Sequence, residues 1–155
     1  MIDRSKTADP ANVLLVEPAD ETARLARTAF SNDGSKTTIH TVSDGEAALE
    51  FLHRCGEYAD APRPCLVILR LDLPDSGPDG TAVLEEMRQA TTLARIPVVV
   101  TVDSPTPDTA SALYQLGANA VVSTPADSDS LLETLELVAQ FWIDTARLPN
   151  RNDRC

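Results

Sequence analysis

The sequence predicts an α/β fold in which five parallel strands form a doubly wound sheet covered by five helices. Apolar runs of strand length alternate five times with segments of helical period, which is the pattern of consecutive βαβ units. The runs are short and rich in β-branched residues, as strands buried on both faces are. A chain of 155 residues with 43% hydrophobic residues suits one domain with one core.

The five predicted strands follow one another at intervals that leave room for a helix between each pair. The second of them, TTIHTV, is half polar, so we expect it at an edge of the sheet, where one side is less completely covered. The predicted strands are residues 12–16, 37–42, 66–69, 97–101 and 120–122.

The segments between the strands carry apolar residues at spacings of three and four, which predicts helices. Asp44, Asp79 and either Asp127 or Ser128 stand where N-caps belong, and Gly117 stands where a helix should stop. The predicted helices are residues 19–30, 45–55, 80–89, 107–116 and 128–142.

Domain organisation and location follow from the distribution of apolar residues. We expect one domain over residues 12–146, a flexible N-terminal tail at 1–11 and a C-terminal tail at 147–155. No apolar run approaches the ~20 residues that cross a bilayer, and the polar first ten residues do not resemble a secretory signal. These features predict a cytoplasmic protein without membrane contact.

The charge of the chain disfavours nucleic acid as a partner. The formal net charge is −11, from 24 acidic residues against 13 lysines and arginines, so the average field repels a phosphate backbone. Only Lys6 and Lys36 among these cations are lysines. This acidity and arginine preference suggest a halophilic or GC-rich source.

In a doubly wound sheet, sites form beyond the carboxyl ends of the strands. The residues to examine are therefore those that directly follow each strand. They lie in seven stretches of the sequence. These stretches are LLVEPADETARLARTAF, TVSDGEAALEFLHRCGEYADAPRP, LVILRLDLP, DGTAVLEEMR, IPVVVTVDS, LGANAVVSTPAD and QFWIDTARLP.

In order and spacing these stretches resemble the response-regulator receiver family over residues 12–149. The resemblance implies a flavodoxin-like sheet of strand order 2-1-3-4-5 and a role in two-component or phosphorelay signalling, not an enzyme. EYADAPRP and the FW…RLP ending are similar to stand-alone receivers that lack an output domain and work beside sensor histidine kinases or phytochromes. We therefore expect such a kinase, or another signalling protein, as partner.

The chain departs from the family pattern at the phosphorylation site. The family implies an acidic pair after strand one, a phosphoacceptor Asp ending strand three, a hydroxyl residue after strand four and a Lys before Pro after strand five. Glu17 keeps the first acid, but Pro18 replaces the second, Arg70 stands at the acceptor position, Val102 replaces the hydroxyl residue and Thr124 replaces the Lys.

These replacements predict a receiver that is not phosphorylated. Arg70 is a permanent cation without an acceptor lone pair, so it is no nucleophile. We expect no cofactor: Mg²⁺ generally needs carboxylates, and Glu17 and Asp72 are only weak candidate ligands. As a hypothesis, Arg70 pairs with Glu17, Asp72 or Asp103 and fixes one conformation, a pair worth roughly 1.5–3 kcal/mol if partly buried. Alternatively, Arg70 points to solvent.

Two other functions remain open from the sequence. The chain could be a phosphoaccepting regulator that uses a relocated carboxylate, Asp72 or Asp103, with Mg²⁺. More remotely, it could be a small flavodoxin-like enzyme or nucleotide binder, although the chain contains no GxGxxG, P-loop or nucleophile elbow.

Phe141 and Trp142 suggest an interface on the last helix. Adjacent helical residues lie about 100° apart, so burying both within one monomer is difficult. We expect one of them in the core and the other in a homodimer or kinase-facing surface that involves the fourth and fifth helices.

Overall fold

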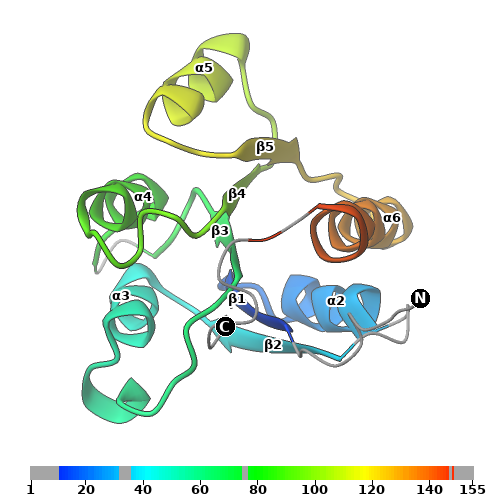
Figure 1. Ribbon diagram of the computed structural model, residues 1–155. Helices are drawn as coiled ribbons and strands as arrows, with labels where there is room; N and C mark the ends of the chain where they lie inside the picture. Colours follow the sequence, from blue (N-terminus) through cyan, green and yellow to red (C-terminus); the bar gives the residue numbers. More distant parts are fainter. Residues whose placement is uncertain (1–10, 32–35, 75–76, 147, 149–155) are drawn as a thin grey trace.

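The computed structural model describes residues 11–31, 36–74, 77–146 and 148 (Figure 1). The tails predicted at 1–11 and 147–155 lie outside the described residues, except for Leu148 and for Ala11, which is the first residue of β1. Among the described helices none is both long and apolar enough to span a bilayer.

Five parallel strands form the sheet in the order β2-β1-β3-β4-β5, which confirms the predicted fold class and strand order. The half-polar β2 is an edge strand, as predicted, and β5 is the other edge. The strands are β1 (Ala11–Val16), β2 (Thr37–Val42), β3 (Leu66–Arg70), β4 (Val98–Val102) and β5 (Ala120–Ser123).

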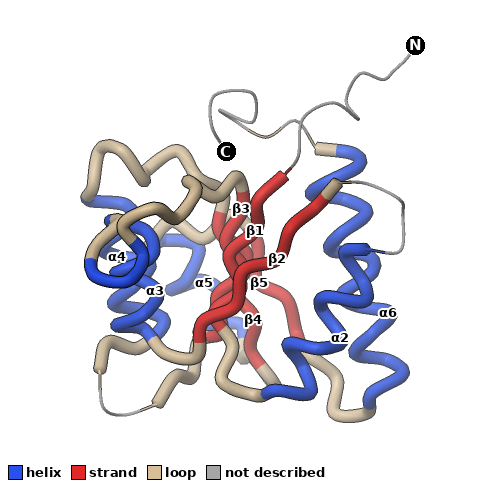
Figure 2. The backbone as a smooth tube through the Cα atoms, turned by 90° about the horizontal axis from the view of Figure 1, so that it is seen from below, coloured by secondary structure: helices blue, strands red, loops and turns tan. Residues whose placement is uncertain are grey.

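Helices cover both faces of this sheet, with α2 and α6 on one face and α3, α4 and α5 on the other (Figure 2). Three N-caps were predicted correctly: Asp44, Asp79 and Asp127 each accept a hydrogen bond from an amide of the first turn, at 2.8–2.9 Å. The helices are α2 (Asp20–Ser31), α3 (Gly45–His53), α4 (Gly80–Gln89), α5 (Pro107–Gln115) and α6 (Ser128–Ala139).

Three helices end earlier than predicted, α5 by a single residue, at Gln115 instead of residue 116. After His53, Arg54 adopts a left-handed conformation (φ 59°) that closes α3, so the helix does not reach residue 55. After Ala139 the chain continues as a π-helical segment, η2 (Gln140–Thr145), rather than as the α-helix predicted to residue 142. Hydrophobic period alone does not distinguish these two helix types over one turn.

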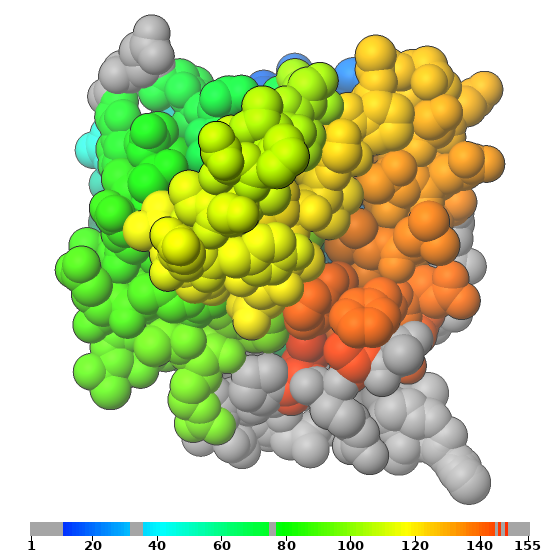
Figure 3. Space-filling view, turned by 90° about the horizontal axis from the view of Figure 1, so that it is seen from above, coloured from blue at the N-terminus to red at the C-terminus, as the bar shows by residue number. Residues whose placement is uncertain are grey.

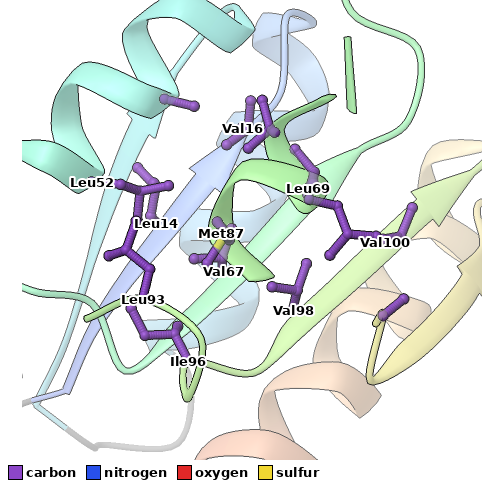
Figure 4. Packing of buried hydrophobic residues seen from close by; sticks show 14 of the residues in the cluster. Leu14, Val16, Leu52, Val67, Leu69, Met87, Leu93, Ile96, Val98 and Val100 are labelled. Carbon is purple, nitrogen blue, oxygen red and sulfur yellow. The ribbon is translucent and has the colours of Figure 1, made fainter. Parts of the chain in front are cut away.

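Side chains alternate along each strand and so build two hydrophobic clusters. On β1, Leu14 and Val16 face α3 and α4, whereas Val13 and Leu15 face α2 and α6. Figure 4 shows the first cluster, in which Met87 of α4 lies among the strand side chains. Burial on both faces explains why the strand sequences are almost continuously apolar.

Two close contacts fix α4 and α5 against the sheet. A Cβ atom on Gly80, the first residue of α4, would lie 2.6 Å from the carbonyl oxygen of Arg70, so only glycine allows this approach of α4 to β3. On the edge strand, the amide of Val121 donates to the hydroxyl of Tyr114 from α5 across 3.2 Å.

Candidate functional site

A cavity of about 680 Å³ opens beyond the carboxyl ends of β1, β3, β4 and β5. It lies where doubly wound folds form their sites. Six of the seven residues that the sequence assigned to the pocket line it: Glu17, Pro18, Arg70, Asp72, Asp103 and Thr124.

Val102 is the predicted pocket residue that does not line the cavity. It is buried in the first hydrophobic cluster, with Val98 and Val100 of the same strand. Because side chains alternate along a strand, residues at even positions of β4 face α3, α4 and α5. Placing Val102 in the pocket was therefore wrong.

Arg70 is the last residue of β3, and its side chain is 16% exposed. Nη2 of Arg70 lies 2.7 Å from Oδ2 of Asp103, in the loop after β4. This hydrogen bond is the main reason that the pKa of Arg70 is raised, and the charges of Glu17 and Asp72 act in the same direction. Of the three partners considered from the sequence, Asp103 forms the ion pair, and the guanidinium does not point freely into solvent.

Thr124, which follows β5, holds the other oxygen of the same carboxylate. Its hydroxyl donates to Oδ1 of Asp103 across 2.7 Å. Ser123 adds a longer bond of 3.4 Å from its hydroxyl to the backbone carbonyl of Asp103, a contact that the sequence analysis missed. We call the arrangement of Arg70, Asp103 and Thr124 the Asp103 clasp. It ties the loop after β4 to the ends of β3 and β5.

Exposure limits the strength of the clasp. The Asp103 side chain is 66% exposed, so water and salt screen the pair, and a contribution of about 0.2–1 kcal/mol is appropriate. The range of roughly 1.5–3 kcal/mol applied to a partly buried pair, a condition that the exposed Asp103 side chain does not meet. The pKa of the Asp103 carboxyl is lowered, first by the hydrogen bond from Arg70 and then by that from Thr124.

Glu17 is the buried carboxylate of the site, with 6% of its surface exposed. Its Oε2 accepts a hydrogen bond of 3.1 Å from the amide of Ala19. Burial raises the pKa of Glu17, and the Ala19 bond and the nearby charge of Arg70 offset that effect only in part. The protonated form of Glu17 is therefore favoured more than in an ordinary exposed carboxyl group.

The donor set of the cavity does not fit a divalent cation. Pro18 offers no side-chain ligand, and Arg70 brings a guanidinium to the position where a carboxylate would be needed. Across the ranges that the structure describes, no three His, Cys, Asp or Glu side chains are grouped so that they could hold a metal ion. Glu17 and Asp72, the weak candidates, are part of no such group.

The second predicted surface lies on η2. Trp142 is half-buried and packs on the second hydrophobic cluster, whereas Phe141 is 52% exposed. Their rings meet edge to face, with centroids 5.1 Å apart. Leu137, one turn earlier on α6, is also exposed, so Leu137 and Phe141 form an apolar pair on the surface.

With this geometry established, comparison with known proteins decides the family. Residues 13–136 match the response regulator receiver domain. The chain belongs to this family. The match confirms the resemblance to the receiver family that the sequence indicated. Members of this family are signalling proteins of phosphorelay pathways.

The chain is also similar to individual response regulators over nearly its whole length. It is 35% identical to the response regulator Rcp1 of Synechocystis sp., over 90% of this chain and 94% of that protein. It is 33% identical to the probable methanogenesis regulatory protein FilR2 of Methanothrix harundinacea, over 95% of this chain and 93% of that protein.

Solved structures of two such relatives share the fold. The Mn²⁺-bound form of Rcp1 superposes with a TM-score of 0.85, over 90% of this chain and 99% of that chain. The phosphorylated cyanobacterial phytochrome response regulator RcpA, 37% identical, gives a TM-score of 0.84, over 90% of this chain and 98% of that chain. The protein is thus a receiver domain related to phytochrome response regulators.

Proposed function

We propose that this protein is a pseudo-receiver, a cytoplasmic signalling module that acts through protein contacts without being phosphorylated. The observation that carries the proposal is the ion pair of 2.7 Å between Arg70 and Asp103. A cation stands at the acceptor position of the family pattern, and a carboxylate from the neighbouring loop neutralises it. The loop is thereby held in one place without a phosphoryl group.

A sensor histidine kinase of the phytochrome type is the partner we propose. The support is the similarity to Rcp1 and RcpA, the latter a phytochrome response regulator, across almost the full length of each protein. A receiver that docks on such a kinase but takes no phosphoryl group would compete with phosphorylated receivers for the same surface.

The alternative function is a phosphoaccepting regulator that uses Asp103 or Asp72. Both oxygens of Asp103 are already hydrogen-bonded, to Arg70 and Thr124, which leaves its carboxylate poorly placed to attack. Asp72 lines the cavity with an exposed side chain, yet no cluster of ligands for a metal ion surrounds it within the described part of the chain. These contacts favour the pseudo-receiver.

Intact-mass spectrometry after incubation with acetyl phosphate and Mg²⁺ distinguishes the pseudo-receiver from the phosphoaccepting regulator. We expect no added phosphoryl group on this protein, while RcpA, treated in parallel, gains one. A phosphoryl group that appears on the wild type and disappears in Asp103→Asn or Asp72→Asn would instead establish the relocated acceptor.

We further propose that a second copy of the chain covers the apolar pair Leu137 and Phe141. Figure 3 looks onto the face formed by α5, β5 and α6. Sedimentation of Phe141→Ser and of Leu137→Ser should show a monomer where the wild type is dimeric. A wild type that sediments as a monomer at all accessible concentrations would rule out this dimer.

A further inference from the structure

Three arginines lie at the amino ends of the strands, on the side of the sheet that α3 and α4 cover. Arg54 directly follows α3, Arg63 lies in the segment before β3, and Arg95 lies in the loop before β4. Figure 2 shows the loops that lead into β3 and β4 at the end of the sheet opposite to the starts of α2 and α6. We call Arg54, Arg63 and Arg95 the amino-end arginines.

Arg63 is positioned by the chain around it. It precedes the buried Pro64, which restricts the backbone of Arg63 to extended conformations. Its Nη1 donates to the carbonyl of Thr92, in the loop before β4, across 3.4 Å. A side chain that is already positioned loses less conformational freedom when it binds a ligand. The segment before β3 is thus joined to the loop that carries Arg95.

Arg88 of α4 fixes that loop from its other side. Its Nη1 donates to the carbonyls of Ala94 and Ile96, the two neighbours of Arg95, at 2.8 and 3.1 Å. Its Nε donates to the carbonyl of Gly117 at 2.9 Å. Because the guanidinium of Arg88 is engaged by backbone carbonyls, Arg88 supports this surface and is not one of the amino-end arginines.

Within the residues that the structure describes, no carboxylate forms an ion pair with an amino-end arginine. The ion pairs found there are Arg24 with Glu21, His53 with Glu86, and Arg70 with Asp103. Glu57 and Asp60 share the segment of Arg63, and both are exposed to solvent. The pKa of Arg63 is lowered, first by burial and then by the charge of Arg54, so a second cation lies near it.

The helix dipole accounts for only one of these cations. Arg54 follows the last turn of α3, where a cation stabilises the negative end of the helix. Arg63 and Arg95 lie outside the α-helices, so this reason does not apply to them. Guanidinium groups bind carboxylates through two parallel hydrogen bonds, and the exposed surface leaves room for such a partner.

We propose that the amino-end arginines bind a short acidic segment of a partner protein, with Asp or Glu carboxylates as the recognised groups. A short segment fits because the attraction of three arginines is screened beyond about 8 Å at physiological salt. An extended polyanion or an anionic membrane would meet the repulsion of a chain whose net charge is −11. This inference goes beyond the proposed function, because it concerns the other end of the sheet from Arg70 and Asp103.

Titration of the full-length protein with a tetraglutamate peptide, followed by NMR, tests the surface. We expect saturable shifts of the Nε–H signals of Arg54, Arg63 and Arg95, whereas a tetraglutamine peptide should shift none of them. The shifts should decrease as salt is added. A tetraglutamate peptide that leaves the three signals unchanged at low salt would overturn the proposal.

Arg54→Asn removes one guanidinium and leaves the backbone of α3 intact. Asn accepts the left-handed conformation found at this position (φ 59°), and the bonds that close the helix come from the backbone amide. We expect the Kd for tetraglutamate to rise about two- to fivefold, the effect of losing one exposed ion pair. Arg24→Gln removes an equal charge from the pair with Glu21 on α2 and is the matched control, with an unchanged Kd. Equal weakening in both variants would show that only the overall charge attracts the peptide.

Phosphate-bearing ligands provide the remaining test. We expect the wild type to stay in the supernatant when phosphatidylserine vesicles are sedimented, because the net charge of the chain is negative. If the wild type sediments with the vesicles and Arg54→Asn does not, the surface binds a membrane and the acidic-segment proposal is wrong. It is equally wrong if inorganic tripolyphosphate shifts the signals of the amino-end arginines and tetraglutamate does not.

Discussion

Arg70 at the end of β3 and Asp103 in the loop after β4 form an ion pair, with Nη2 of the arginine 2.7 Å from Oδ2 of the aspartate. Thr124 completes the arrangement from the end of β5. Three neighbouring strands are therefore joined at their carboxyl ends by side chains of this chain.

A double-mutant cycle with Arg70→Gln and Asp103→Asn should give a coupling free energy of about 0.2–1 kcal/mol in urea unfolding, decreasing as salt is added. The exposed pair Arg24 and Glu21, three residues apart on α2, is the control, and we expect its coupling to be smaller. A coupling of zero at low salt would show that the contact contributes nothing to the folded state.

Thr124→Val should lower the free energy of unfolding by about 1 kcal/mol, because the hydroxyl that binds Asp103 is lost, whereas Thr124→Ser should retain most of the stability. The Asp103 pKa, measured by NMR, should rise in Thr124→Val and rise more in Arg70→Gln, because the bond from Arg70 is the larger cause of the lowering. The reverse order would contradict the assignment.

The contributions of Asp103 and Glu17 to the free energy of unfolding should change with pH in opposite directions. The lowered pKa of Asp103 means that its stabilisation is present above the ordinary Asp pKa of about 3.9 and is lost as pH falls through the folded value. The raised pKa of Glu17 means that its ionised form destabilises the fold once pH exceeds the folded value. Glu17→Gln should therefore raise the urea midpoint at pH 7.

That gain should disappear below the ordinary Glu pKa of about 4.3, where the wild-type group is already protonated in both states. Asp103→Asn should instead lose stability at pH 7 and approach the wild type in acid. Urea midpoints of both variants and the wild type, measured from acid pH to pH 7, test these expectations. A Glu17→Gln variant less stable than the wild type at pH 7 would show that ionised Glu17 does not destabilise the fold.

Gly80→Ala should destabilise the domain by about 1–3 kcal/mol, because the new methyl group would overlap the backbone of Arg70 and Leu71. Gly77→Ala is the matched control in the loop before α4: its nearest neighbour, Cβ of Glu46, would lie at an ordinary contact distance of 3.9 Å. Thermal unfolding of both variants checks the prediction. Equal melting temperatures would mean that α4 can shift away from β3 at little cost.

The strands and the N-caps could be predicted because they depend on local composition and on the alternation of helices and strands, whereas the strand order was implied by the resemblance to the receiver family. The ion-pair partner of Arg70 could not be predicted, since it depends on the register between β3 and β4. Arg70 lies opposite Thr101, and Asp103, two residues further, returns to the same side of the sheet, whereas Val102 faces the other side. Without that register, Glu17, Asp72 and Asp103 were equivalent candidates.

The role of Arg88 left no signal in the sequence. Its partners are mostly backbone carbonyls, and backbone acceptors are the same at every position of a chain. The π-helical turn after Ala139 was likewise missed, because one turn of wider helix keeps the apolar residues on nearly the same face.

The bond between Tyr114 and the amide of Val121 has a consequence for the behaviour of the protein in concentrated solution. An edge strand with free amides offers a template on which a foreign strand can add, and this is a common start of aggregation. By accepting this hydrogen bond, the phenol oxygen removes one free amide of β5 from those that could pair with another strand. Replacing Tyr114 with phenylalanine would keep the ring and return the site to any extended chain nearby.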